Sequence, residues 1–321
     1  MTGVVAVTGA SGFVGRRLCA RLITMGFRVR GLGRHGGQGP WDQWAGCDID
    51  EAVPARLLDG VHTVFHVAGR AHMDMPRPED AHLFFRTNRD GTVNLMEAAV
   101  QAGVRQVVFF STVKAAGDPG SQCVDENWGA PPDDAYGRSK LEAEHLVFTM
   151  GRAGGMHVCC LRPALVYGPG VKGNLWRMMQ AIDRNRFPPI PEYGNKRSLI
   201  HVDDLVAAAV LAMERPEADG RTYIVAEPEP YSSRQIYEIL ALALKGSIPR
   251  WSAPDWLLRA GARVGDLLDR WGMPAGFDTP AYQRLSSSAC YLPDRIAREL
   301  GFGVIRTLGD AADDMVEQFR P

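Results

Sequence analysis

The stretch VVAVTGASGFVGRRL, at residues 4–18, constrains the fold of this chain more than any other feature of its sequence. Its β-branched beginning is typical of a strand and its end of a helix, with Gly9, Gly12 and Gly15 between them. In such a turn the first glycine permits a sharp bend, the second lets a pyrophosphate approach the backbone, and the third lets the helix pack closely on the sheet. The stretch therefore predicts a dinucleotide-binding turn, with the spacing G-x-x-G-x-x-G. The residues that we expect to contact the cofactor here are Gly9, Ser11, Gly12, Phe13, Val14 and Gly15.

Short apolar runs alternate with helix-like segments through the first half of the chain. Strand-like runs lie at 4–7, 27–32, 63–69, 106–112 and 157–168, and helix-like segments lie near 13–25, 92–103 and 134–146. This alternation predicts an α/β fold with a doubly wound, mostly parallel sheet of the Rossmann type. We expect a dinucleotide-binding domain at 1–168, to which 197–226 return, and a smaller, mostly helical substrate-binding region at 169–196 and 227–321. An amphipathic helix is predicted at 252–272, with Trp256, Leu257, Val264 and Leu267 as its apolar residues.

Composition excludes several classes of protein. A formal net charge of −1 with interspersed acids and bases gives no basic face, so nucleic acid is not an expected partner. The longest apolar run, at 205–213, is far shorter than the about 20 residues that cross a bilayer, and the N-terminal segment does not resemble a signal peptide. Six cysteines without a C-x-x-C motif favour buried free thiols in the cytoplasm, and eight histidines without H-E-x-x-H predict no metal site.

The end of the second predicted strand bears on the choice of cofactor. An NAD site normally has a carboxylate there for the ribose 2′-hydroxyl, but this chain has Gly33 and Arg34. An arginine there either binds the 2′-phosphate of NADP or simply faces solvent, and both interpretations stay open. The sequence favours NADP modestly over NAD. Asp48 and Ile49, at the end of a third predicted strand at 44–49, are candidates for contact with the adenine.

Tyr136 and Lys140 stand one helical turn apart in DAYGRSKLEAEHL, at residues 134–146. Asp133 or Asp134 is a possible N-cap of the predicted helix. Residues i and i+4 share one helix face, so both side chains can reach one ligand. A tyrosine has a pKa of about 10. For its phenolate to act as a base near pH 7, that pKa must be lowered by about three units. A neighbouring ammonium group and a cationic nicotinamide ring both stabilise the phenolate. The pair therefore predicts an acid/base device that serves hydride transfer.

Two hydroxyl groups stand at the end of the preceding strand, in FFSTVKAAG at 109–117. The hydroxyl of Ser111 or Thr112 is placed to hydrogen-bond the substrate oxygen that Tyr136 deprotonates. The alternative is a local turn in which the hydroxyl bonds only the backbone at the strand end. Elsewhere, His66 lies within a strand and is interpreted as a hydrogen-bonded core residue. His201, Asp203 and Asp204 are interpreted as the start of a helix that an aspartate caps.

Several longer motifs occur in a characteristic order: TGASGFVG, HVAG, TNRDGTVNLMEAA, FFSTVKAAG, YGRSKLEAE, LRPALVYGPG and RSLIHVDDL. Over most of residues 1–213 the chain thereby resembles the extended short-chain dehydrogenase/reductase family, in its NAD-dependent epimerase/dehydratase branch. The resemblance implies that Thr112, Tyr136 and Lys140 are the catalytic residues. It also implies that Asn88 supports the active-site helix through its backbone. A set of contacts with the cofactor is implied as well. These contacts would involve Ala68, Gly69, Asn88, Ser111, Tyr136, Lys140 and Pro163.

Within the family the chain most resembles bacterial UDP-sugar 4-epimerases and 4-keto reductases, through GVKGNLWRMM and KRSLIHVDD. That likeness implies a nucleotide or phosphate contact at Asn174 and a diphosphate contact at Arg197, with Arg284 as a second phosphate contact. Each of these could instead be a loop residue that faces solvent. A nucleotide-sugar substrate and a homodimer are therefore expected.

Two departures from the family pattern narrow the activity. Val113 and Lys114 stand where the sugar dehydratases have an acidic pair, which argues against dehydration. The missing carboxylate after the second strand favours a reductase that exchanges NADPH over an enzyme with permanently bound NAD. We therefore expect a 4-epimerase of a UDP-hexose, with a 4-keto-6-deoxysugar reductase as the alternative. A hydroxysteroid-type dehydrogenase and a non-catalytic NADP-binding regulator are more distant possibilities.

Overall fold

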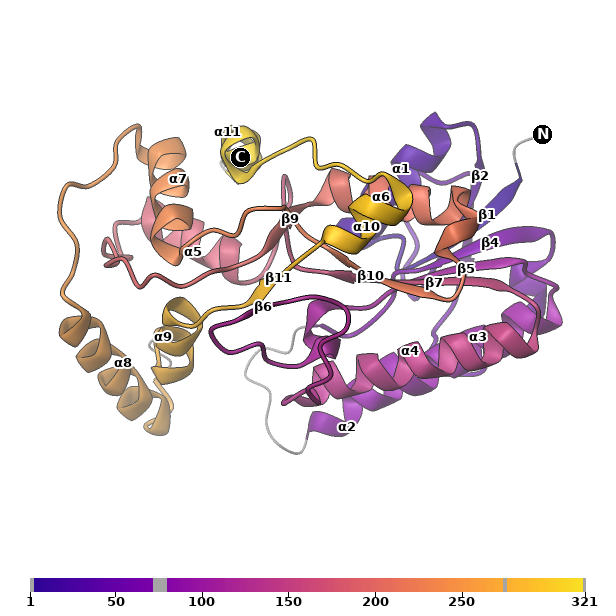
Figure 1. Cartoon of the computed structure of the whole chain (residues 1–321), viewed down its shortest axis with the longest axis horizontal. Helices are drawn as coiled ribbons and strands as arrows, with labels where there is room; N and C mark the ends of the chain where they lie inside the picture. The colour runs from indigo at the N-terminus through magenta and orange to yellow at the C-terminus, as the bar shows by residue number, and fades with distance from the viewer. Residues whose placement is uncertain (1–2, 72–79, 274–275, 320–321) are drawn as a thin grey trace.

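A parallel sheet forms the centre of the molecule (Figure 1). The structure is a computed structural model that describes residues 3–71, 80–273 and 276–319. Its seven-stranded sheet has the order β10-β7-β5-β4-β1-β2-β3, and each neighbouring pair of strands is parallel. The strands are β1 (Val4–Thr8), β2 (Arg28–Gly33), β3 (Gln43–Gly46), β4 (Val61–His66), β5 (Gln106–Phe110), β7 (His157–Pro163) and β10 (Arg221–Val225). The doubly wound α/β fold predicted from the sequence is confirmed.

The order of the strands reverses between β1 and β4, which are neighbours in the sheet. In open α/β sheets ligands bind at such a switch point, outside the carboxyl ends of the strands. The glycine turn follows β1, and the HVAG motif begins at the last residue of β4. The topology therefore brings these two motifs together.

Helices cover both faces of the sheet (Figure 1). One face packs against α1 (Phe13–Thr24), α6 (Val202–Glu214) and α10 (Asp294–Leu300), and the other packs against α3 (Gly91–Gln101) and α4 (Ala135–Ala153). Successive strand residues face opposite cores, so that Val5 belongs to the first core and Ala6 to the second. Burial on both faces explains why these strands are apolar throughout rather than alternating.

A second, mostly helical part lies beyond the carboxyl ends of the strands. It contains α5 (Asn174–Asp183), α7 (Ser233–Lys245), α8 (Asp255–Arg270), α9 (Thr279–Ser286) and α11 (Leu308–Phe319). Its own core includes Leu175, Met179, Leu240 and Met315. Two small parallel sheets join the parts, β8 (Leu165–Tyr167) with β9 (Leu199–His201), and β6 (Cys123–Val124) with β11 (Cys290–Tyr291). The exact domain boundaries stay a prediction.

The remaining short elements lie in the connections. They are η1 (Ala55–Leu58), α2 (Ala81–Phe84), the π-helical turn η3 (Phe85–Asp90), and the 3-10 helices η4 (Val113–Ala116) and η5 (Pro216–Ala218). No helix among the described residues is both long enough and apolar enough to cross a bilayer.

The cysteines differ in part from the expectation. Cys19, Cys47, Cys159 and Cys160 are buried free thiols as predicted, but Cys123 and Cys290 form a disulfide. The prediction of free thiols is therefore wrong for this pair. The two cysteines are 167 positions apart in sequence, and the parallel pairing of β6 with β11 places their Cα atoms 4.5 Å apart. Sequence spacing alone cannot reveal such a contact.

The start of α6 is also different from the prediction. The residue that caps it is His201, whose Nδ1 accepts a hydrogen bond from the backbone N–H of Asp203 at 3.2 Å. The expected aspartate cap is therefore wrong. Asp204 is buried instead, and its carboxylate accepts hydrogen bonds from the backbone N–H groups of Ile305 and Arg306. It thus fixes the segment that leads to α11.

Candidate active site

A cavity of about 1340 Å³ lies at the carboxyl ends of the strands, between the sheet and the helical part. Every residue that the sequence analysis proposed for the site lines this cavity. They are Gly9, Ser11, Gly12, Phe13, Val14, Gly15, Arg34, Asp48, Ile49, Ala68, Gly69, Asn88, Ser111, Thr112, Tyr136, Lys140, Pro163, Asn174, Arg197 and Arg284. The roles proposed for them stay predictions, but the fold brings all of them to one place.

The glycine turn has the geometry that a dinucleotide requires. Gly9 has a positive φ of 65°, and a Cβ there would lie 2.9 Å from the backbone of Ala68. A Cβ at Gly15 would lie 2.2 Å from the carbonyl oxygen of Gly9, so only glycine lets α1 approach the sheet this closely. A Cβ at Gly12 would lie 3.2 Å from the same atom, the carbonyl oxygen of Gly9.

The start of α1 is suited to a phosphate group. Gly12 is its N-cap residue, no side chain caps it, and its first turn has no acidic residue. The first amide groups of a helix have no partner within the helix and carry a partial positive charge. Together with the cradle of glycines, this arrangement fits the pyrophosphate of a nicotinamide dinucleotide.

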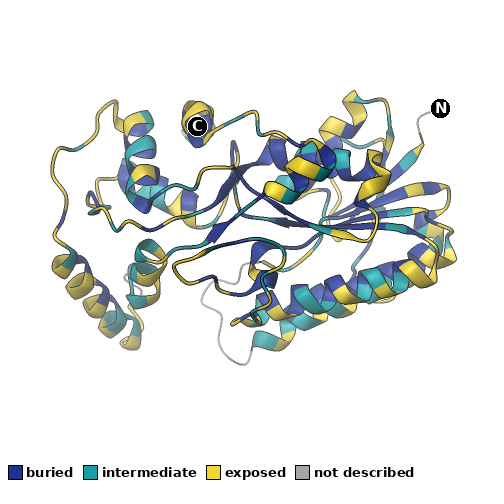
Figure 2. Ribbon diagram, in the orientation of Figure 1, coloured by how far each residue is buried: buried dark blue, intermediate teal, exposed yellow. Residues whose placement is uncertain are grey.

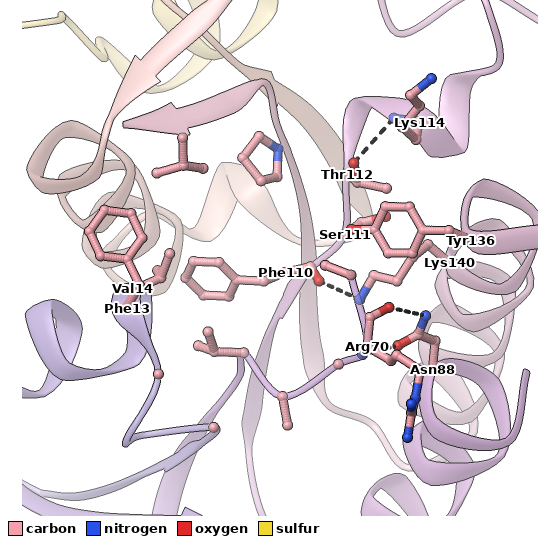
Figure 3. Close-up of a pocket in the computed structure, with 18 of the residues that line it drawn as sticks. Phe13, Val14, Arg70, Asn88, Phe110, Ser111, Thr112, Lys114, Tyr136 and Lys140 are labelled. Atoms are coloured by element: carbon pink, nitrogen blue, oxygen red, sulfur yellow. Dashed lines mark hydrogen bonds between the residues drawn. The ribbon is translucent and has the colours of Figure 1, made fainter. Parts of the chain in front are cut away.

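Asn88 connects the loop after β4 to α4 (Figure 3). Its Oδ1 accepts a hydrogen bond from the N–H of Arg70 at 2.7 Å, and its Nδ2 donates to the carbonyl oxygen of Arg70 at 3.0 Å. Nδ2 also donates to the Oγ of Ser139 at 3.0 Å, and that hydroxyl in turn donates to the carbonyl oxygen of Tyr136. The expected support of the active-site helix is present, but it passes through the side chain of Ser139 rather than directly to the backbone.

The helix α4 positions the tyrosine and the lysine. Asp134 is its N-cap and accepts a hydrogen bond from the N–H of Gly137 at 2.6 Å, which confirms one of the two predicted caps. Tyr136 therefore lies in the first turn and Lys140 one turn later. Figure 3 shows both side chains beside Ser111 and Thr112, across the pocket from Phe13 and Val14.

Without a bound cofactor, the protein makes the phenol of Tyr136 a weaker acid than an ordinary tyrosine. Burial raises the pKa of Tyr136 to about 12, and hydrogen bonding to Thr112 opposes this only in part. Burial also lowers the pKa of Lys140 to about 8, against the opposing charge of Glu144. Lys140 Nζ donates to the carbonyl oxygen of Phe110 at 2.6 Å and lies 4.1 Å from the ring centre of Phe109. The sequence argument expected the lysine to acidify the phenol, but in the chain alone burial raises the pKa of Tyr136 and only the hydrogen bond to Thr112 lowers it.

A buried ion pair behind the lysine was not foreseen from the sequence. Glu144 accepts hydrogen bonds from Arg162 Nε at 2.9 Å and from Arg162 Nη2 at 2.7 Å, and it also accepts one from the hydroxyl of Ser111. Glu144 and Arg162 are both buried. Glu144 lies four positions after Lys140, so its place on the inward helix face was the signal available in the sequence. The pair fixes the end of β5 that carries Ser111.

Two arginines line the cavity, Arg197 from the segment just before β9 and Arg284 from α9. Arg197 Nη1 donates to the carbonyl oxygens of Arg284 at 2.7 Å and of Ser287 at 3.2 Å. Burial lowers the pKa of Arg197, and the nearby charge of Arg284 adds to that effect. Among the described residues no carboxylate forms an ion pair with either arginine. Two guanidinium groups without an anionic partner can receive a diphosphate. Asn174 lines the cavity from the first turn of α5.

Comparison with known proteins places the chain in a family. Residues 5–226 match the family described as the NAD dependent epimerase/dehydratase family. The chain is 31% identical to a UDP-glucose 4-epimerase of Vibrio cholerae, across 83% of this chain and 84% of that protein. It is 26% identical to a 3 beta-hydroxysteroid dehydrogenase/Delta 5-->4-isomerase of Mycobacterium tuberculosis, across 99% of this chain and 90% of that protein.

The fold has a close counterpart among solved structures. MoeE5, solved in complex with UDP-glucuronic acid and NAD, superposes with a TM-score of 0.77 at 25% identity, and the match covers 99% of each chain. The match extends through the helical part as well as the sheet. With its matching family motifs, its glycine turn and its Rossmann-type sheet, the chain is an enzyme of the NAD-dependent epimerase/dehydratase family.

Proposed function

We propose that this enzyme is a 4-epimerase of a UDP-hexose, of the UDP-glucose or UDP-N-acetylhexosamine type. The observation that carries the proposal is the continuity of the cavity. It runs from the glycine turn, past Tyr136 and Lys140, to Arg197 and Arg284, where Arg197 Nη1 donates to the backbone carbonyl oxygen of Arg284. A dinucleotide at one end and a nucleotide diphosphate at the other place the sugar between them, beside the phenol.

The residues of the chain have separate tasks in this reaction. A bound nicotinamide dinucleotide supplies the hydride acceptor and donor. Tyr136 takes the proton of the C4 hydroxyl and later returns one, while Thr112 orients the oxygen atom by hydrogen bonding. Lys140, held against the carbonyl oxygen of Phe110, provides a positive charge beside the phenol and a donor for the ribose. Arg197 and Arg284 hold the diphosphate, so the sugar can present either face after C4 is oxidised.

The raised pKa of Tyr136 matters for this proposal. A phenol with a pKa of about 12 is a poor base near neutral pH. The charge of an oxidised nicotinamide ring near the phenol favours the phenolate. We therefore expect the pKa of Tyr136 to fall when the oxidised cofactor binds. Proton transfer is then active only in the loaded enzyme.

One observation favours the alternative, an NADPH-dependent reductase of a nucleotide-linked 4-keto-6-deoxysugar. Gly33 ends β2 and Arg34 follows it on the cavity wall, where an NAD site has a carboxylate. Asp48 also lines this part of the cavity. If Arg34 binds the 2′-phosphate, Arg34→Asp should raise the Kd of NADPH at least tenfold and leave the Kd of NADH nearly unchanged. Equal effects on both cofactors would contradict a preference for NADP.

The substrate experiment separates the two activities. Purified protein is incubated with UDP-glucose, UDP-N-acetylglucosamine and a UDP-4-keto-6-deoxysugar, each with and without NADPH. Formation of the C4 epimer without added cofactor supports the epimerase. Consumption of NADPH with the keto sugar alone supports the reductase. Turnover of a hydroxysteroid with none of these sugars would overturn both proposals.

The role of Tyr136 has its own test. Tyr136→Phe should reduce turnover at least a thousandfold and leave the affinity for the cofactor nearly intact, because the phenyl ring keeps the packing and only the proton donor is lost. Tyr237→Phe is the matched control, since Tyr237 is a buried tyrosine in the core of the helical part. Unchanged activity in the Tyr136 variant would refute the assignment. The presence of Tyr136 and Lys140 argues against a non-catalytic regulator.

The setting of the enzyme completes the proposal. We infer a cytoplasmic homodimer that supplies sugar nucleotides for polysaccharide synthesis. This inference follows from the family resemblance and from the proposed nucleotide-sugar substrate. Light scattering after size-exclusion chromatography tests the dimer, and a mass of about 35.1 kDa at all concentrations would contradict it.

A further inference from the structure

The helix α8 turns an apolar face toward solvent. Its inward side packs against the chain through Leu258, Ala262 and Gly265, and a Cβ at Gly265 would lie 1.8 Å from the carbonyl oxygen of Phe277. The opposite side is exposed along its whole length, and the predicted amphipathic helix is therefore oriented with its large apolar residues outward. We call these residues the outer stripe: Trp256, Leu257, Val264, Leu267 and Trp271.

The exposure of the outer stripe is large for such residues. Trp256 is 68% exposed, Trp271 67% and Val264 57%. Trp251, which precedes the helix, is 60% exposed, and Met273, which follows it, is 52% exposed. Contiguous exposed apolar surface of this kind marks an interaction site more often than single exposed residues do.

The helix also lies at an extremity of the molecule. Figure 1 shows α8 at the end of the structure opposite the N-terminus, outside α9, and Figure 2 shows its outer surface as exposed. A broad flat surface can therefore reach the outer stripe without first meeting the sheet. Because Arg259 Nε donates to the hydroxyl of Tyr282 at 2.9 Å, α8 is fixed to α9, which carries Arg284 on the cavity wall.

The charges of α8 are divided between its two sides. Arg263 and Arg270 are exposed and lie beside the outer stripe on the helical wheel. Asp255 accepts a hydrogen bond from the hydroxyl of Tyr282 at 2.7 Å, and Asp266 accepts one from the N–H of Thr279 at 2.8 Å. These two carboxylates are thus used within the protein, and the charge next to the outer stripe is positive.

We propose that α8 docks the enzyme on the surface of an anionic lipid bilayer. The outer stripe lies at the level of the headgroups, where tryptophan is favoured, and Arg263 and Arg270 contact lipid phosphates. The helix lies in the plane of the surface and nothing in the proposal crosses the bilayer. A second copy of the chain fits this face less well. It would bring a second set of the same arginines to the interface, and Asp255 and Asp266 face inward.

The test is flotation of the full-length protein with lipid vesicles. One set contains phosphatidylcholine alone, and in the other phosphatidylglycerol replaces about a third of it. Wild-type protein should float with the anionic vesicles, and salt should weaken the binding. Trp256→Glu with Trp271→Glu should lower the bound fraction at least tenfold. Arg263→Glu with Arg270→Glu should remove the preference for anionic vesicles.

The matched control is Ile305→Glu, at an apolar residue that is 81% exposed away from α8. It should bind vesicles like wild type. All variants should keep the wild-type circular dichroism spectrum and the wild-type turnover of soluble substrate, which separates lost docking from lost folding. The proposal is overturned if wild-type protein floats with neither vesicle, or if the tryptophan variant floats equally well. It is also overturned if light scattering shows a dimer that the tryptophan variant converts to monomer, because the face then belongs to a second copy.

Discussion

Acidification should destabilise this enzyme through one buried imidazole. His66 ends β4 and is completely buried. Its Nε2 lies 3.0 Å from the Oγ1 of Thr92, and its Nδ1 lies 2.8 Å from the Oγ1 of Thr8. Thr92 donates its own hydrogen to the carbonyl oxygen of Asn88 at 2.6 Å, so it must accept from Nε2–H. Nδ1 is then an acceptor, and the network fixes the neutral imidazole.

The pKa of His66 gives the direction and size of the effect. Burial lowers that pKa from 6.5 to about 3, and the charge of Lys140 adds to the effect. Between about pH 3 and pH 6.5, His66 is protonated in the unfolded chain but stays neutral in the folded protein. Stability is therefore fully present above pH 6.5 and falls as the pH falls toward 3. Each pH unit in this window costs about 1.4 kcal/mol, or about 2 kcal/mol between pH 6.5 and pH 5.

The assay is urea unfolding of wild type and of His66→Gln at several pH values between about 7.5 and about 5. The variant is less stable at pH 7.5 because it loses hydrogen bonds, but it has no group at this position to titrate. Subtracting one curve from the other removes the titration of all other groups. The stability advantage of wild type should shrink by about 2 kcal/mol across the interval. An advantage that stays constant with pH would refute the reasoning.

The same network reaches the cofactor region. The Oγ1 of Thr8 accepts a hydrogen bond from the N–H of Ala68 at 3.1 Å while it donates to His66. A protonated imidazole would no longer accept from Thr8, and the hydroxyl would have to turn. The affinity of the folded protein for the cofactor should therefore hold through the range in which stability falls, and decline only as the pH approaches the folded-state pKa of His66, about 3.

Three further predictions concern the scaffold of the site. Glu144→Gln should lower the free energy of unfolding by about 3–5 kcal/mol, because it leaves the buried charge of Arg162 without a partner, and urea unfolding measures this. A smaller loss than about 1 kcal/mol would contradict the buried ion pair. Gly15→Ala should cost at least about 2 kcal/mol and weaken cofactor binding, since its Cβ would clash with a carbonyl oxygen at 2.2 Å. Wild-type stability and affinity in that variant would count against the close helix packing. Peptide mapping without reductant should recover Cys123 linked to Cys290, and reduction should lower the stability by up to about 5 kcal/mol, as expected for a loop of 167 residues. Free thiols at both positions in the purified protein would show that the bridge does not form.

The sequence revealed the parts of the site that depend on local pattern. The positions of Gly9, Gly12 and Gly15 follow from one strand–turn–helix, and the shared face of Tyr136 and Lys140 follows from the helical repeat. The carboxyl ends of parallel strands meet at one edge, so strand-end residues such as Thr112 were placed correctly as well.

What the sequence could not show depends on contacts between distant segments. The bridge between Cys123 and Cys290 requires the pairing of two strands of two residues each, for which no periodicity exists. The pKa of Tyr136 depends on how many side chains surround it, and residue spacing does not report burial. The amphipathic pattern of α8 predicted a helix and its apolar residues, but the pattern alone does not report that this side faces solvent.

The path of the chain through the sheet limits how such an enzyme can diverge. After β8 the chain builds α5 and then returns for α6 and β10, which adds the outermost strand beside β7, before it leaves again for α7, α8 and α9. The helical part is thus assembled from segments on both sides of a structural strand. Recombination that exchanged everything after residue 168 would also remove that strand and its covering helix. New substrate preferences must therefore be acquired by substitutions and loop insertions within a retained scaffold, rather than by the transfer of a ready-made module.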